Sequence, residues 1–240
     1  MYGICFFTGM AVAVFAAWLL SKRRDLMGYD VIYAAVIAGV GAVIGSKLLF
    51  LVLNLKNIIE YDIPLINVIK GGFVFYGGLI GGIIGLFIYV RVYKLNTWDF
   101  FDLFATVLPL GHSVGRVGCF LGGCCYGIEY HGPLSCTYTV NIGNTPLGVP
   151  LFPVQLVEAL FLLCLFAALL VLYMRGAQRG TVVLVYGFSY SAIRFVLEFL
   201  RGDKERGFLW GVSTSQILSL ILGAVLFILF LTKRKKAKKR

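Results

Sequence analysis

Charged residues are scarce in this chain: they make up 14% of its 240 residues, against about 25% in soluble domains. Acidic side chains are the scarcest, with 11 Asp and Glu against 22 Lys and Arg, and there are only two histidines. Hydrophobic residues make up 60%, and the mean hydropathy is +0.90. A chain so poor in charge cannot cover a large surface that faces water. This composition excludes an ordinary soluble fold and predicts a protein that lies in a lipid bilayer.

The excess of basic residues does not follow the pattern of a nucleic-acid-binding protein, because no basic stripe with interleaved aromatic residues occurs. Seven of the basic residues instead lie in the last eight positions, KRKKAKKR (233–240), directly after an apolar run. Such a segment is typical of a juxtamembrane anchor, in which each basic residue contributes about 1 kcal/mol near an anionic surface. We therefore expect anionic lipid as the partner of this tail, and no nucleic acid.

A signal peptide is not expected either. The first apolar run, from Gly3 to Leu20, is not preceded by basic residues, and no small-residue cleavage site follows it. We expect it to be a retained first helix. No internal repeat and no soluble domain are found.

Apolar runs long enough to cross a bilayer, which takes about 20 residues, recur along the whole chain. They predict an all-α polytopic protein, a single membrane domain over residues 1–240 with seven transmembrane helices. The expected spans are 3–20, 31–54, 72–93, 100–120, 153–174, 180–200 and 210–232.

The distribution of Lys and Arg between the connections predicts the orientation. With the N-terminus outside, 14 of the 22 basic residues lie on the cytoplasmic side and five on the outer side, and three remain within spans. The C-terminus is then cytoplasmic. Two long connections, 55–71 and 122–152, lie outside and form a small extracytoplasmic loop region. The alternation in TYTVNI (137–142) predicts a short strand pair in the second connection.

The segment Gly111–Gly127, GHSVGRVGCFLGGCCYG, places an arginine among apolar residues. A charge inside a membrane span costs several kcal/mol unless it is paired or lines a polar cavity, so Arg116 is a candidate functional residue. His112 lies four residues earlier and therefore on the same helical face.

Other candidate residues lie on the neighbouring spans. Tyr76 begins a glycine-rich face, FYGGLIGGIIG, most of whose glycines are explained by close helix packing. Arg194 and Glu198 are spaced as an i, i+4 pair. Glu158 lies in an apolar helix and needs a partner, for which a buried arginine is the obvious choice. Tyr2, taken alone, is typical of the aromatic belt at a membrane interface.

Five motifs in the order FYGGLIGG, GRVGCFLGGCCYG, FPVQLVE, IRFVLEFLRGD and STSQILS make the chain resemble the bacterial prolipoprotein diacylglyceryl transferases. The resemblance extends over nearly the whole chain. It implies a transferase of the bacterial plasma membrane that needs no cofactor and no metal. Such an enzyme moves a diacylglyceryl group from phosphatidylglycerol to the lipobox cysteine of a prolipoprotein, and glycerol phosphate leaves.

The resemblance also implies roles for individual residues. Arg116 matches the arginine that holds the phosphatidylglycerol head group, and Arg194 with Glu198 matches a second functional pair. The expected catalytic residues are Arg116, Tyr76, His112, Arg194 and Glu198. The expected substrate-binding residues are Arg116, Tyr2, Gly77, Gly78, Gly127, Gln155 and Glu158.

Three positions depart from the family pattern: Tyr76 replaces a histidine, Cys119 an asparagine and Cys124 an acidic residue. A phenol with a reference pKa of about 10 is a poorer base than an imidazole near 6.5, so His112 is an alternative base. These changes leave two other functions open. One is a related transferase with a different acceptor, and the other is a non-catalytic lipid-binding or redox protein on the same scaffold.

The six cysteines fall into two groups. Cys119, Cys124 and Cys125 lie at the outer end of the fourth span, and Cys136 follows in the outer loop. We expect a structural disulfide between Cys136 and either Cys124 or Cys125, since an external location permits disulfides. Two adjacent cysteines are a weak metal signal. The remaining two, Cys5 and Cys164, lie in apolar spans and are expected to be packing residues.

Overall fold

The computed structural model describes residues 1–60, 72–140, 142–203, 208–209 and 212–238. Part of the outer connection 55–71, including Lys70, and also Asn141, Lys204 and Arg206 lie outside the described residues. The chain forms two compact units, one of Met1–Ala17 with Phe101–Arg240 and one of Trp18–Phe100. Each unit is described by itself below.

Helices dominate both units. The first contains most of α1 (Tyr2–Ser21) and α5 (Thr97–Leu121), and all of α6 (Val154–Met174), α7 (Thr181–Glu198) and α8 (Thr214–Lys238). The second contains the short 3-10 helix η1 (Lys22–Arg24), α2 (Gly28–Glu60) and α4 (Phe75–Val92). Among the described residues, six helices are long and apolar enough to cross a membrane, and α8 has a shorter apolar section, Ser215–Phe230. The predicted all-α membrane architecture is confirmed.

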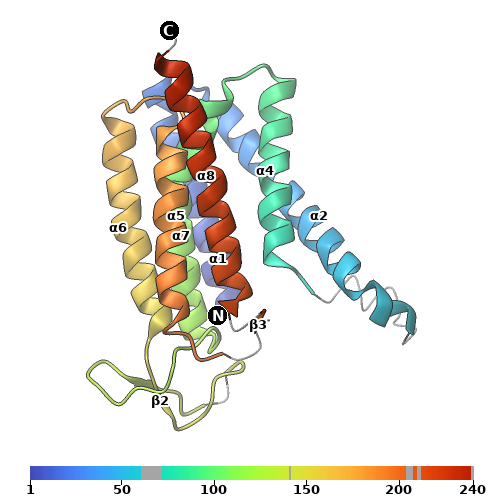
Figure 1. Cartoon of the computed structure of the whole chain (residues 1–240), viewed down its shortest axis with the longest axis vertical. Coiled ribbons are helices and arrows are strands. Elements are labelled where there is room, and N and C mark those ends of the chain that lie inside the picture. Colours follow the sequence, from blue (N-terminus) through green and yellow to red (C-terminus); the bar gives the residue numbers. More distant parts are fainter. Residues whose placement is uncertain (61–71, 141, 204–207, 210–211, 239–240) are drawn as a thin grey trace. The chain divides into compact units, whose positions relative to one another are not determined.

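Within the first unit, α7 packs against both α6 and α8. Figure 1 shows the chain's N-terminus and the connection after α5 at one end of this unit, and the C-terminus at the other. The assignment of the N-terminus to the outer side stays a prediction.

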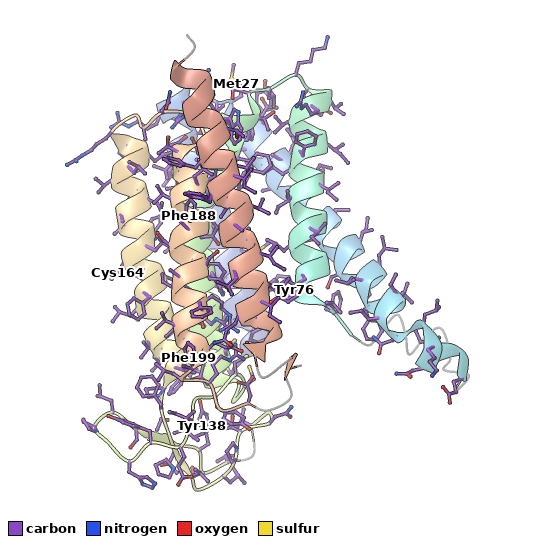
Figure 2. The ribbon with its side chains drawn as sticks, viewed as in Figure 1. Met27, Tyr76, Tyr138, Cys164, Phe188 and Phe199 are labelled. Atoms are coloured by element: carbon purple, nitrogen blue, oxygen red, sulfur yellow. The ribbon has the colours of Figure 1, made fainter. Side chains whose placement is uncertain are left out.

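Close contact between α1 and α5 depends on glycine. A Cβ added to Gly9 would lie 2.5 Å from the carbonyl oxygen of Gly111, and one added to Gly118 would lie 2.6 Å from Cβ of Cys5. Cys5 therefore packs between the two helices, as expected. The expectation for Cys164 is wrong, because this residue lies on an exposed face of α6 (Figure 2).

A buried aspartate holds the start of α7. The side chain of Asp102, on α5, accepts hydrogen bonds from the backbone N–H groups of Gly180 at 2.7 Å and Val183 at 3.0 Å. The first amides of a helix have no partner within the helix, and a carboxylate there also interacts favourably with the helix dipole. Asp102 therefore fixes where α7 begins relative to α5.

The connection after α5 contains the predicted strand pair in a shifted position. Strand β1 (Cys136–Thr137) pairs antiparallel with β2 (Pro150–Leu151), so among the described residues of the segment 137–142 only Thr137 belongs to a strand. Tyr138 adds a single bridge to Leu147. A second antiparallel pair, β3 (Phe208–Leu209) with β4 (Val212–Ser213), precedes α8 and was not predicted.

The second unit is built on glycine contacts between α2 and α4, as the repeat in the sequence indicated. A Cβ added to Gly77 would meet the carbonyl oxygen of Gly45, and one added to Gly81 would meet that of Gly41. Polar pairs complete the unit. Ser46 donates to the carbonyl of Val74 at 3.0 Å, Tyr89 to Asp30 at 2.8 Å, and Arg24 pairs with Asp99 at 2.8 Å.

Candidate active site

The centre of the candidate site is a buried ion pair between α5 and α6. Nη2 of Arg116 lies 3.0 Å from Oε1 of Glu158, and the two side chains are 13% and 2% exposed. This confirms that a buried arginine is the partner of the glutamate in the apolar helix. Among the described residues, Nε of Arg116 has no hydrogen-bond partner. The guanidinium is therefore oriented by one carboxylate and keeps donors for a second anion.

His112 belongs to the same cluster. Its Nε2 lies 4.0 Å from Oε1 of Glu158, one helical turn before Arg116 along α5. Its ring centroid lies 5.5 Å from that of Tyr190 on α7. A proton-accepting side chain is thus placed beside the arginine.

One face of α7 contributes four residues, spaced every fourth position: Tyr186, Tyr190, Arg194 and Glu198. The rings of Tyr186 and Tyr190 stack with centroids 5.9 Å apart. Arg194 pairs with Glu198 at 2.9 Å, which confirms the i, i+4 prediction. The two tyrosines were not predicted, although extending the same spacing by two turns toward the N-terminus would have found them.

Arg194 is also held from α8. Its Nη2 donates a hydrogen bond to Oγ of Ser215 at 3.1 Å, whereas Nη1 has no hydrogen-bond partner among the described residues. A second buried guanidinium on the same unit therefore has a free donor.

An apolar groove of about 560 Å³ runs along α7 and α8. Phe188, Phe195 and Phe227 line it, and Figure 2 labels the first of these on α7. Phe195 directly follows Arg194 in the chain, but Arg194 is not among the residues that line the groove. A groove of this size and composition suits a hydrocarbon chain.

Three cysteines converge where α5 ends. The sulfur atoms of Cys119, Cys124 and Cys125 all lie within 4.8 Å of one another. All six cysteines are free, so the expected disulfide between Cys136 and Cys124 or Cys125 is wrong. The turn after α5 bends back and carries its two cysteines toward Cys119, whereas Cys136 is held in the ladder between β1 and β2.

Gln155, at the start of α6, braces this turn. Its Nε2 donates to the carbonyl oxygen of Cys124 at 2.9 Å, and the residue is 2% exposed. The turn is also covered by Tyr138, whose hydroxyl donates to the carbonyl of Phe120 at 2.8 Å. Burial and the neighbouring Cys136 raise the pKa of Tyr138 to about 12, so this hydroxyl stays a donor at neutral pH.

Gly127 has a structural reason to be glycine. A Cβ at this position would collide with the carbonyl oxygen of Phe152, and the residue forms a single bridge with Arg201. Arg201 binds Asp203 through two hydrogen bonds, of 3.1 and 2.7 Å. Burial acts to lower the pKa of Arg201, but the bond to Asp203 and the nearby Cys125 outweigh it and the pKa is raised. The sequence had suggested no role for this arginine.

The remaining predicted residues are divided between the units. Tyr2 is exposed in the first unit, and its Cβ lies 3.3 Å from a Cβ built on Gly122. Tyr76, labelled in Figure 2, lies with Gly77 and Gly78 at the start of α4 in the second unit. Gly77 is buried against α2. Their roles toward a substrate stay predictions.

The geometry defines a class of protein: a multi-pass membrane protein with two buried arginines that retain hydrogen-bond donors, and with an apolar groove on the same unit. The chain belongs to the family described as prolipoprotein diacylglyceryl transferase, whose model matches residues 1–232.

Similar proteins carry the name of the same kind of transferase. The chain is 36% identical over 236 residues to a phosphatidylglycerol–prolipoprotein diacylglyceryl transferase of Clostridium tetani, covering 94% of this chain and 91% of the relative. It is 34% identical over 240 residues to one of Dehalococcoides mccartyi, covering 99% and 90%. It is also 31% identical over 231 residues to the second such transferase of Clostridium perfringens, covering 94% and 89%.

Proposed function

We propose that this protein transfers a diacylglyceryl group from phosphatidylglycerol to the lipobox cysteine thiol of prolipoproteins in the bacterial plasma membrane. The observation that carries the proposal is the arginine at the site centre, paired with Glu158 and retaining free donors. Family membership supports the reaction type. The products are a thioether on the precursor and glycerol phosphate.

Arg116 binds the lipid phosphate in this mechanism. A planar guanidinium can donate two parallel hydrogen bonds to phosphate oxygens, and a low-polarity surrounding strengthens them. When the carbon–oxygen bond of the lipid breaks, negative charge grows on the departing glycerol phosphate. The same guanidinium offsets that charge in the transition state. Glu158 keeps the guanidinium in place while the remaining donors face the lipid.

Arg194 and the apolar groove hold the rest of the lipid. Its free Nη1 provides a second cationic donor, and Glu198 and Ser215 fix its position. The apolar groove along α7 and α8 receives an acyl chain, which requires no polar partner. A two-tailed lipid can then enter sideways from the bilayer with its head group directed toward the arginines.

His112 is our candidate for the base that accepts the thiol proton, with Tyr76 as the alternative. Its imidazole lies beside the Arg116–Glu158 pair, which supports the assignment. Full activity in His112→Ala, together with loss of activity in Arg116→Ala, would exclude His112. In that case Tyr76→Phe tests the phenol.

The other substrate contacts are proposed from the resemblance. They are Tyr2, Gly127 and Gln155 in the first unit, and Gly77 and Gly78 in the second. The basic tail, 233–240, binds anionic lipid on the cytoplasmic side.

The test is complementation. The protein is expressed in a strain depleted of its own transferase, and a lipobox reporter is analysed by mass spectrometry. We expect the reporter to gain the mass of a diacylglyceryl group with the native protein, and a smaller fraction of the reporter to be modified with Arg116→Lys. A correctly inserted native protein that gives no mass increment would refute the proposed acceptor.

A second candidate function is transfer to a different acceptor. It is favoured by the three positions that depart from the family pattern, Tyr76, Cys119 and Cys124. Consumption of phosphatidylglycerol without modification of the reporter would support it.

A further inference from the structure

The three thiols at the end of α5 form a donor set for a metal ion. In a tetrahedral zinc site with Zn–S bonds of about 2.3 Å, neighbouring sulfurs lie about 3.8 Å apart. The sulfurs of Cys119, Cys124 and Cys125 already lie within 4.8 Å of one another. Small side-chain rotations bring them to the required spacing. We had expected adjacent cysteines to be poor common ligands, and the backbone of the turn removes that objection.

The turn is held in an unusual conformation that brings the sulfurs together. Gly123 has φ +60° and Cys125 has φ +56°, and a left-handed backbone is uncommon at a residue other than glycine. The strain is compensated by hydrogen bonds to the turn. Gln155 donates to the carbonyl of Cys124 at 2.9 Å, and Thr145 and the N–H of Asn144 donate to that of Gly123 at 2.5 and 3.2 Å. Such outer contacts orient the ligands of a metal site.

Positive charge surrounds the thiols. Arg116 lies three residues before Cys119 on α5 and interacts electrostatically with Cys119 and Cys125. Arg201 also interacts electrostatically with Cys125. One divalent ion with three thiolates carries a net charge of −1, which these guanidinium groups offset. The same arginines would favour a fourth, incoming thiolate.

We infer that Cys119, Cys124 and Cys125 bind one zinc ion and leave its fourth position for the acceptor cysteine of the proposed reaction. Three protein ligands and one open position are typical of catalytic zinc sites, and thiolates are preferred ligands of this ion. The inference rests on the proposed function for the identity of the incoming thiol. It also gives a reason for two departures from the family pattern, because Cys119 and Cys124 replace residues that are poorer zinc ligands.

The chemical step balances without an oxidant or reductant. The acceptor thiol loses its proton as its sulfur binds zinc, and His112, the base of the proposed reaction, accepts it. The bound thiolate then attacks the glyceryl carbon that carries the phosphate ester, and a carbon–sulfur bond forms. The carbon–oxygen bond breaks and its electron pair stays on the phosphate oxygen held by Arg116. The neutral thioether is a weak ligand and leaves the ion, which binds the next thiol.

The first experiment measures metal binding by the full-length protein in detergent or nanodiscs. Reduced, metal-free protein is titrated with cobalt(II), and zinc(II) is added in competition. We expect one equivalent of cobalt to bind with intense sulfur-to-cobalt charge-transfer absorption that zinc abolishes. Cys119→Ser should lower zinc affinity by more than about 100-fold, because losing even an outer-shell partner costs 10- to 100-fold.

Two cysteines outside the cluster supply the matched controls. Cys136→Ser and Cys164→Ser should bind cobalt like the native protein. Absence of charge-transfer absorption, or a spectrum unchanged in Cys119→Ser, would overturn the site. A thiol count on freshly isolated, unreduced protein would also overturn the site if it shows a disulfide within the cluster. A metal analysis that finds copper in place of zinc would overturn it as well.

The second experiment separates this inference from the proposed function. A lipobox peptide is added to the cobalt protein, and a peptide with serine in place of cysteine serves as the control. We expect only the cysteine peptide to increase the charge-transfer absorption. If the charge-transfer absorption does not increase, the fourth-ligand assignment is overturned. Full transfer of the diacylglyceryl group to the peptide by metal-free protein would overturn it too. In both cases the proposed function stands. An increase without transfer would support the site and refute the proposed reaction.

Discussion

Replacing Arg116 by lysine tests the role of the guanidinium separately from its charge. The side chain pairs with Glu158 at 3.0 Å while its Nε has no partner among the described residues, so it can orient on the carboxylate and still bind phosphate. A lysine keeps the ion pair and the folded state. It offers one compact ammonium group that must be shared between carboxylate and phosphate.

The expected loss follows from the hydrogen bonds that lysine cannot make. One bond to a charged partner contributes about 1.5–3 kcal/mol, and this corresponds to a fall in kcat/KM of about 12- to 160-fold. Arg116→Ala is a less informative change. It leaves the carboxylate of Glu158, 2% exposed, without its charge partner, and breaking a buried pair in this way costs about 3–5 kcal/mol of stability.

The assay follows release of glycerol phosphate from phosphatidylglycerol with a lipobox peptide as acceptor, using purified protein in lipid nanodiscs. Thermal unfolding of the variant is measured in parallel. Arg91→Lys is the matched control, since Arg91 is an exposed residue near the end of α4 that packs over Phe87. An unchanged kcat/KM in the Arg116→Lys variant would refute phosphate binding through two parallel hydrogen bonds from the guanidinium.

Three further predictions concern the scaffold around the site. Gly81→Ala should destabilise the protein by about 1–3 kcal/mol, because the added methyl group meets a backbone carbonyl of α2. Gly82→Ala should be neutral or stabilising, because a Cβ added there lies 3.4 Å from its nearest neighbour. Equal unfolding temperatures for the Gly81→Ala and Gly82→Ala variants would contradict this explanation from helix packing. Asp102→Ala should lower stability by about 3 kcal/mol or more through loss of two charge-assisted bonds at the start of α7, and unchanged thermal unfolding would show that they are dispensable. Ser215→Ala should lower kcat/KM by about tenfold (about 1.4 kcal/mol), because the hydroxyl holds Arg194 at 3.1 Å, and an unchanged value would remove this serine from the site.

Much of the fold could be predicted from composition and local spacing. Scarcity of charge and repeated apolar runs predict membrane helices because a bilayer leaves few other structures possible for a long apolar chain. Pairs within one helix are also local, since four residues are about one turn, and the prediction of Arg194 with Glu198 was correct for that reason. The glycine contacts between α2 and α4 follow equally from a repeat on a single helix.

Contacts between helices could be predicted only where a buried charged side chain needed a partner of opposite charge. A glutamate in an apolar helix needs a cation, so pairing of Glu158 with a buried arginine was expected and found. Nothing in the sequence pointed to Asp102 at the first amides of α7, or to Tyr190 beside His112. Such contacts depend on how far each helix slides and rotates against its neighbour, and local spacing carries no information about that.

The sequence alone determined the membrane class and the family resemblance, and it singled out Arg116 as a candidate, because each depends on residue type and order along the chain. Only the tertiary structure decided what the cysteines do. The predicted external location suggested a disulfide to Cys136, but the left-handed turn after α5 brings Cys119, Cys124 and Cys125 within 4.8 Å of one another and leaves all of them free. The direction of a side chain at a turn depends on the backbone φ of a single residue, which the order of amino acids does not reveal.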